Sequence, residues 1–589
     1  AIGHDAMKEN TSGGGNTAVG NMSMSSNTTG GANSAFGKEA LGSNTSGMRN
    51  TAIGYYAIRA VTTGSNNTAI GKDALMTNQT GNNNTSLGYR TLELSTAHNN
   101  TAVGYKALLK NTTGSGTAVG FQALDANTTG EGNSAFGFEA LGANTSGTNN
   151  NAYGNYALLN NTTGDGNVAI GVSSLKSNIT GEFNVSIGGQ SLEDNNGNFN
   201  VAVGTAALQK NTSGNHSIGI GHFALNKNTS GVTNIAIGSH ALENNTTTNN
   251  NIAIGYEALK VNTIGDNVAI GNFALSSNVT GLMMTAIGTG ALQKSTGNYN
   301  TAVGTRALSE NTIGYDNTAV GTEAMKENVN GYRNTALGFH ALKVNTAGNT
   351  NTAVGAEALY SNITGSKNTA FGWHSMFRNT TGNSNTAIGW QAMDSNTTGS
   401  LNVGVGEDAL RLNTTGNNNT AVGYKAGEKL ESNNNTAVGF YALLKTTTGV
   451  SNTAIGNSSI QDNTTGQDNT ALGLGSLMRN TTGSYNTTVG YGSGDNITTG
   501  SRNVIIGNNA DASSITAVNQ IVIGEAATGT GDNQIALGNT SITHIKAQVN
   551  SITAYSDKRI KREINDSKLG LDFIMKLRPV TYKMKNPAD

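Results

Sequence analysis

The chain is organised by a short motif of alternating polar and apolar residues that recurs at nearly constant spacing. The motif reads Asn-Thr-Ala-Val-Gly at residues 16–20, and its close variants end at glycines that run from Gly3 to Gly507. Between these two glycines lie 24 intervals of 17 residues and six of 16. Such a unit is too short for a strand, a helix and two connections. The sequence therefore predicts an all-β, parallel β-solenoid (a β-roll) of 16–17-residue turns over residues 1–507.

The Thr-Ala-Val segment of each unit alternates with the period of a β-strand, so Thr and Val face one way and Ala the other. The residue before the glycine is large and apolar in every unit, as at Ile53 and Phe136. This regularity predicts that these residues face the core. The opposite position holds Ala or a small substitute, as at Ser86 and Gly219. The uniformly small side chains at this position predict that another backbone approaches closely there. They also predict that copies of the chain associate through the alanines.

A second apolar pair, Ala-Leu, follows three and four residues after the glycine, as at Ala107 and Leu108. We expect it to form a second strand whose Leu meets the large apolar residues across the coil. The next residues, Asn-Thr-Thr-Gly or Asn-Thr-Ser-Gly, predict a return turn, because Asn and Gly tolerate positive φ. Identical turns stacked at about 4.8 Å predict ladders of hydrogen-bonded Asn side chains. The same turn chemistry explains the many Asn-x-Thr triplets better than glycan attachment does.

Composition excludes several classes of partner. The chain has 35 Lys and Arg against 36 Asp and Glu, so it lacks the basic surface that nucleic acid binding needs. No stretch approaches the ~20 consecutive apolar residues of a membrane span, so we expect no membrane insertion in this segment. With no Cys, the chain has neither disulfides nor thiolate metal sites.

Candidate chemistry along the repeats is sparse. The eight histidines lack ligand spacing, with His216 and His222 the closest pair, so no metal site and no cofactor is expected. A glycan-cleaving enzyme needs two carboxyl groups about 5–10 Å apart in a cleft, yet no insertion interrupts the register to form one. Aromatic residues that follow the glycine, such as Tyr105, Trp373 and Trp390, predict an aromatic outer edge. We expect these rings to pack between chains rather than on sugars.

The Thr-Ala-Val/Ile-Gly core of the unit resembles the head repeats of trimeric autotransporter adhesins. In that family, short repeats of the Ser-Val-Ala-Ile-Gly type build a left-handed parallel β-roll that trimerises about its long axis. The resemblance covers the core of the motif, and the unit here is longer. The resemblance implies that this chain forms a homotrimeric rod and that its coil is left-handed.

The repeat pattern weakens near the end of the chain. Gly494 and Asp511 stand where other units carry Leu. Residues 508–555 therefore predict an irregular β transition. Residues 551–589 then hold nine Lys and Arg against five Asp and Glu, which marks a composition boundary and a third segment, 556–589.

That third segment contains Ser-Asp-Lys-Arg-Ile-Lys at 556–561, Gly-Leu-Asp-Phe-Ile at 570–574 and Pro-Val at 579–580. With these motifs it resembles the start of the intramolecular chaperone of endosialidase type, found at the C-termini of phage tail spikes and fibres. It implies a domain that assembles the trimer and is then removed by a Ser–Lys dyad. Carried over, Ser556 is the nucleophile, Lys561 is the base and the cut falls just before Ser556.

A lysine can activate a serine in this way once desolvation lowers its pKa. The alternative reading of residues 556–561 is a solvated basic lead-in to a helix. The amphipathic pattern of residues 567–577 predicts a short helix, so this segment is an α-containing fragment. Since the sequence continues for only 33 residues after Ser556, the segment holds just the start of such a domain.

Together these features predict a structural and adhesive homotrimeric fibre of a phage-like particle. The rod is its shaft for host attachment, the C-terminal chaperone is self-cleaving, and the expected receptor is a glycan or protein on the host surface. The alternative is a trimeric adhesin or extracellular filament of a bacterial cell surface. No substrate turnover is expected beyond the single autoproteolytic cut. We therefore expect the protein in the virion tail fibre or outside the cell.

Overall fold

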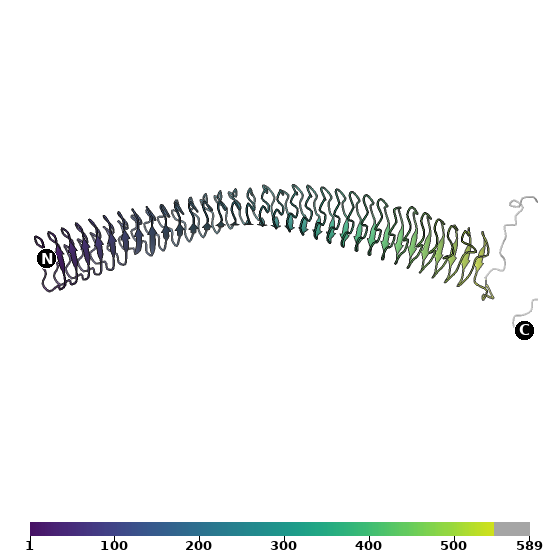
Figure 1. Ribbon diagram of the computed structural model, residues 1–589, viewed down its shortest axis with the longest axis horizontal. Coiled ribbons are helices and arrows are strands. Elements are labelled where there is room, and N and C mark those ends of the chain that lie inside the picture. The colour runs from purple at the N-terminus through teal and green to yellow at the C-terminus, as the bar shows by residue number, and fades with distance from the viewer. Residues whose placement is uncertain (547–589) are drawn as a thin grey trace, which may run out of the picture. The chain divides into compact units, whose positions relative to one another are not determined.

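The computed structural model describes residues 1–546 and divides the chain into two units, Ala1–Leu537 and Gly538–Asp589. The first unit is an all-β parallel solenoid, and no helix occurs in the described residues. Its turns follow one another in chain order along one axis, from purple to yellow in Figure 1. The fold class predicted from the repeat is confirmed for this unit.

Each turn contributes one short strand, which pairs in parallel and in register with the strands of the turns before and after it. The strands are β1 (Thr17–Val19), β2 (Ser34–Phe36), β3 (Thr51–Ile53), β4 (Thr68–Ile70), β5 (Thr85–Leu87), β6 (Thr101–Val103), β7 (Gly116–Val119), β8 (Asn133–Phe136), β9 (Asn151–Tyr153), β10 (Val168–Ile170), β11 (Val185–Ile187), β12 (Val201–Val203), β13 (Ile218–Ile220), β14 (Ile235–Ile237), β15 (Ile252–Ile254), β16 (Val268–Ile270), β17 (Thr285–Ile287), β18 (Thr301–Val303), β19 (Thr318–Val320), β20 (Thr335–Leu337), β21 (Thr352–Val354), β22 (Thr369–Phe371), β23 (Thr386–Ile388), β24 (Val403–Val405), β25 (Thr420–Val422), β26 (Thr436–Val438), β27 (Thr453–Ile455), β28 (Thr470–Leu472), β29 (Thr487–Val489), β30 (Val504–Ile506), β31 (Ile521–Ile523) and β32 (Ile535–Leu537).

The core is narrow and made of small residues. In a typical turn, the central Ala35 of the strand and the pair Ala40 and Leu41 are fully buried. Where glycine replaces the central alanine, at Gly219, an added Cβ would lie 3.2 Å from the carbonyl oxygen of Ala224 in the same turn. A backbone does approach this position closely, as predicted, but it belongs to the chain itself.

The predicted orientation of the strands is therefore wrong. The large residue before each strand glycine faces outward, with Ile53 40% exposed and Phe371 55% exposed. The alanines face the interior of their own chain, so they are not accessible for association between copies. Alternation places the two sets on opposite faces, but the space inside the turn decides which set points inward. In the regular turns that space is filled by Leu from the other side of the coil and leaves room for a small residue, usually Ala.

The Ala-Leu segment is a turn and not the predicted second strand. Residues two and four after the strand glycine have positive φ, as at Tyr56 (60°) and Ile58 (51°). Their N–H groups donate in opposite directions, Tyr56 to the Lys38 carbonyl at 3.1 Å and Ile58 to the Ala74 carbonyl at 2.9 Å. The left-handed conformation costs roughly 1–2 kcal/mol for such a residue. Hydrogen bonds to both neighbouring turns and burial of the large side chain offset this cost.

The return turn forms the predicted Asn ladders. Asn44 Nδ2 donates to Asn27 Oδ1 of the previous turn at 2.7 Å and to its own turn's Gly47 carbonyl at 3.1 Å. A second ladder precedes the strand, where the Asn50 backbone N–H donates to Asn33 Oδ1 at 2.8 Å. These Asn side chains are buried, so they satisfy backbone groups that water cannot reach.

Glycine in the return turn has a different cause from the one predicted. Gly47 is not in the positive-φ region, but a Cβ there would lie 2.3 Å from the Gly64 carbonyl oxygen of the next turn. The strand glycine has both constraints: Gly54 has φ of 138°, and its Cβ would lie 2.5 Å from the Gly71 carbonyl oxygen. Close stacking of turns therefore explains why both positions are glycine.

The sheet continues past residue 507 through β31 and β32, and its core changes from β30 onward. The strand centres become Ile505 and Val522, both buried. Gly494 has no side chain, and a Cβ there would lie 2.8 Å from Thr488 Cγ2 and 3.7 Å from Ile505 Cγ1, so larger strand residues fill the vacated space. The predicted helix at 567–577 lies outside the described residues.

Candidate functional site

The predicted catalytic residues, Ser556 and Lys561, lie outside the described residues. Their roles as nucleophile and base stay predictions. The surface of the described rod carries three other features with chemical character: stacked aromatic rings, a network of ion pairs, and a groove near the end of the regular turns.

The histidines singled out in the sequence pack against aromatic rings. The His216 ring stacks on Phe199 with centroids 5.1 Å apart, and His222 contacts Phe223 edge to face at 4.1 Å. Within residues 1–546, no group of three or more His, Cys, Asp or Glu side chains gathers in a way that could hold a metal ion. In the same residues, no helix has the length and apolar character to cross a membrane.

Aromatic residues directly after the strand glycine do line an outer edge, as predicted. Tyr105, Phe121 and Phe138 stack in succession, with centroids 4.9 Å apart and ring planes within 9°. Trp373 and Trp390 stack in the same way at 5.4 Å. Each ring covers the face of the next, so a ring within a stack presents its edge to solvent rather than its face.

Ion pairs link successive turns between β19 and β25. Glu323 is the centre of one group, with Lys343 Nζ at 2.8 Å, Lys326 Nζ at 3.3 Å and His340 Nε2 at 3.3 Å. The hydrogen bond from Lys343 lowers the pKa of Glu323 to about 2, and Lys326 acts in the same direction. The carboxylate is thus held ionised and occupied by cations. This network suits the cohesion of neighbouring turns rather than acid or base catalysis.

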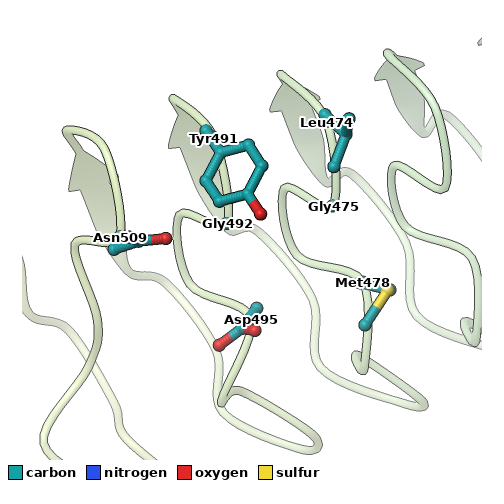
Figure 2. Close-up of a pocket in the computed structure, with 7 residues that line it drawn as sticks. All are labelled: Leu474, Gly475, Met478, Tyr491, Gly492, Asp495 and Asn509. Atoms are coloured by element: carbon teal, nitrogen blue, oxygen red, sulfur yellow. The ribbon is translucent and has the colours of Figure 1, made fainter.

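A groove of about 200 Å³ crosses two turns after β28 and β29. Figure 2 shows the side chains of Leu474 and Tyr491 on one side of the groove and those of Met478 and Asp495 on the other. Gly475 and Gly492 lie between them, and Asn509 lies on the next turn. The lining residues are Leu474, Tyr491, Met478, Asp495, Gly475, Gly492 and Asn509.

The groove exists because two consecutive turns lack a side chain. Gly475 and Gly492 lie two residues after their strand glycines, where other turns carry side chains such as Gln391. Both have positive φ, of 66° and 57°. A Cβ on Gly475 would meet no atom within 4 Å, whereas a Cβ on Gly492 would lie 2.8 Å from Asn509 Oδ1, so the open space is over Gly475 and the Asn509 amide borders it at Gly492. This site was not predicted from the repeat pattern. The sequence feature that marks it is a Gly-x-Gly at residues 473–475 followed one turn later by a second at 490–492.

The groove has a negative electrostatic character. Asp495 lines it, and its charge acts on the carboxyl of Asp511 in the next turn. The pKa of Asp511 is raised to about 6, mainly by burial and also by the charge of Asp495, while Arg479 acts in the opposite direction. No Lys or Arg is among the lining residues. The groove therefore offers carboxylate oxygens as acceptors and the Asn509 amide as both donor and acceptor.

Comparison with known proteins does not assign a family. No protein-family model and no curated protein matches the chain. The fold and the surfaces described above are therefore the basis for the function proposed next.

Proposed function

We propose that the protein is the shaft of a homotrimeric fibre of a phage-like particle and serves in host attachment. The observation that carries this proposal is the uninterrupted parallel ladder from β1 to β32. At about 4.8 Å per turn, such a stack separates its two ends by roughly 150 Å. A solenoid of this kind, in which each turn contacts only its neighbours, is suited to act as a long spacer.

The outward face of the strands supports association between chains. Across all 32 strands, the two outward positions, such as Thr335 and Leu337 in β20, hold no charged residue. The chain as a whole is 12% charged. A sheet face that stays in solvent ordinarily carries charges that prevent aggregation. We therefore propose this outward strand face, and not the buried alanines, as the contact surface of the trimer.

The outward strand face is large enough for a stable interface. A three-residue strand is roughly 10 Å long, so 32 strands at about 4.8 Å present roughly 1,500 Å² per chain. Stable complexes bury about 800 Å² per partner. Another copy of the chain has the same axial repeat and can keep its side chains matched along the whole length. The threefold symmetry itself comes from the resemblance to autotransporter heads.

The assembly state can be tested by light scattering on the purified protein. The parent should have the mass of three 60.3 kDa chains. The double variant Ile220→Glu, Ile237→Glu places two charges on the outward strand face and should give single chains with an unchanged circular dichroism spectrum. The matched control is Ser213→Glu, Ser230→Glu, with two charges on exposed return turns, which should remain trimeric. A folded, monomeric parent would contradict the trimer.

The second candidate is a trimeric adhesin or filament of a bacterial cell surface. It is favoured by the resemblance of the Thr-Ala-Val/Ile-Gly core to autotransporter heads, whereas the chaperone-like residues 556–589 favour the particle. Immunogold labelling with an antibody against the rod distinguishes the two. Label on tailed particles supports the fibre, and label on the surface of intact cells in the absence of particles supports the adhesin.

A further inference from the structure

We propose that the groove over Gly475 and Gly492 binds one ring of a neutral glycan, with Tyr491 as the stacking surface and Asp495 and Asn509 as hydrogen-bonding partners. This goes beyond the proposed function, in which the shaft only carries a receptor-contacting element, because it places a binding site on the shaft itself.

Tyr491 differs from the other rings along the aromatic edge. Its neighbours at the same position of adjacent turns are Leu474 and Asn508, and it is 56% exposed. Within the described residues it stacks on no other ring, whereas Tyr105 is covered by Phe121 at 4.9 Å. One face of Tyr491 is thus available. Pyranose rings have an apolar face of C–H groups that packs on an aromatic surface of this kind.

The polar side of the groove matches hydroxyl groups. The carboxyl oxygens of Asp495 accept hydrogen bonds, and the Asn509 amide both donates and accepts them. Neighbouring sugar hydroxyls need partners of both kinds. Asp495 is the one acidic residue in the lining, which holds no Lys or Arg, and its carboxylate disfavours sugars that carry a carboxylate. The ligand class is therefore a neutral hexose or N-acetylhexosamine.

The size of the groove sets the length of glycan that it holds. Its volume of about 200 Å³ is below the roughly 300–1,000 Å³ of pockets that enclose drug-sized ligands. One ring fits between the two glycines, and the rest of a chain would lie along the exposed turns. A site for one ring predicts weak binding, with a Kd on the order of 1 mM.

Binding can be measured on the full chain by saturation-transfer NMR and calorimetry. The neutral probes are maltotriose, mannotriose and triacetylchitotriose, and trigalacturonic acid is the anionic comparison. At least one neutral trisaccharide should bind, with trigalacturonic acid at least about tenfold weaker.

Two variants and a matched control locate the site. Gly475→Gln should fill the groove and weaken binding at least about tenfold, and Gln391 shows that this turn position accepts Gln with a φ of 53°. Tyr491→Ala removes the stacking surface and should have a similar effect. Gly290→Gln makes the same change at the equivalent position after β17, where φ is also 66°, and should bind like the parent.

Three results would overturn the proposal. The first is that no neutral probe binds at a concentration about twentyfold above the expected Kd. The second is that Gly290→Gln loses as much affinity as Gly475→Gln. The third is that trigalacturonic acid binds more tightly than the neutral trisaccharides. If Gly475→Gln does not fold, Tyr491→Ala alone decides between the outcomes. The assembly state is measured separately by light scattering, so the fibre and the glycan site can fail independently.

Discussion

At individual positions, the tight stacking of turns limits which residues are accepted more strongly than secondary-structure propensity does. Ala336 and Leu337 are adjacent in β20, yet the smaller side chain is fully buried and the larger is 47% exposed. Gly355 cannot be replaced without strain, because a Cβ would lie 2.6 Å from the Gly372 carbonyl oxygen. Burial in this protein therefore follows the space available inside a turn and not the apolar character of the side chain.

Asp511 should make the end of the rod sensitive to pH. Its folded pKa of about 6 lies above the unfolded value of 3.8, because burial disfavours the carboxylate. The folded state then binds a proton more tightly than the unfolded state, so this contribution to stability is present below about pH 4 and is lost as pH rises to 6. Asp511→Asn should raise stability at pH 7 by on the order of 1 kcal/mol and remove the slope.

Urea unfolding at pH 4.5 and pH 7 measures this effect. Glu323→Gln is the comparison with the opposite sign, since the pKa of Glu323 is lowered to about 2 by its bond to Lys343. The contribution of Glu323 is present above about pH 4.5 and is lost as pH falls towards 2. An unchanged urea midpoint for Asp511→Asn at pH 7 would refute the prediction that the buried Asp511 carboxylate destabilises the rod.

Among the elements, the strand is the simplest part of each turn and the connections hold most of the specific structure. Each strand is only three or four residues long, and those from β2 to β31 are paired on both sides. The remaining residues form the positive-φ segment and the return turn, where backbone and Asn side chains bond to the neighbouring turns. The connections thus contribute to cohesion along the axis as directly as the sheet does.

Removing one Asn from the ladder should weaken three turns at once. Asn345 Nδ2 donates to Asn328 Oδ1 at 2.8 Å and to the Gly348 carbonyl at 3.1 Å, while its Oδ1 accepts from Asn362 at 2.7 Å. Asn345→Ala leaves buried polar groups without partners and should cost about 1–3 kcal/mol. The matched control is Asn330→Ala, at an exposed position of the previous return turn.

The measurement is the urea midpoint of each variant, followed by circular dichroism. Asn345→Ala should unfold at lower urea than the parent, and Asn330→Ala should unfold within error of it. Equal midpoints for the two variants would mean that the ladder adds nothing beyond the backbone bonds.

For the whole molecule, repetition raises a problem of register in the proposed trimer. Three chains of nearly identical turns could align in many shifted arrangements, and a shift of one turn would change few local contacts. A device at one end that sets the alignment solves this problem. The changed core at Ile505 and Val522 makes the last turns unlike the rest, so they can distinguish the correct register from a shifted one.

The chaperone-like segment predicts a cut before Ser556 when the complete chaperone domain is present. Removal of the domain after assembly would trap the trimer kinetically, because unfolded chains could no longer be guided back. Mass spectrometry of the full-length product should show chains that end at Tyr555. Ser556→Ala and Lys561→Ala should each leave the chain uncut, and Lys558→Ala is the control that should be cut as the parent is. Efficient cutting of the Ser556 and Lys561 variants would support the basic lead-in to a helix instead.

The sequence alone determined the features that depend on period. A 16–17-residue repeat with a Thr-Ala-Val alternation is sufficient to predict stacked parallel turns, and identical Asn residues in stacked turns are sufficient to predict ladders. Both follow because every copy of a residue has the same neighbours one turn away.

The three-dimensional path of the chain determines which strand face is inside, how many strands a turn has, and where the surface is hollow. Alternation separates Ala336 from Leu337 but does not assign either to the interior, which depends on the path of the opposite segment. That path is set by left-handed residues such as Ile58, whose conformation is stabilised by hydrogen bonds to other turns and not by local preference. The groove at Gly475 and Gly492 has the same origin, since two missing side chains form a site only when the fold stacks them.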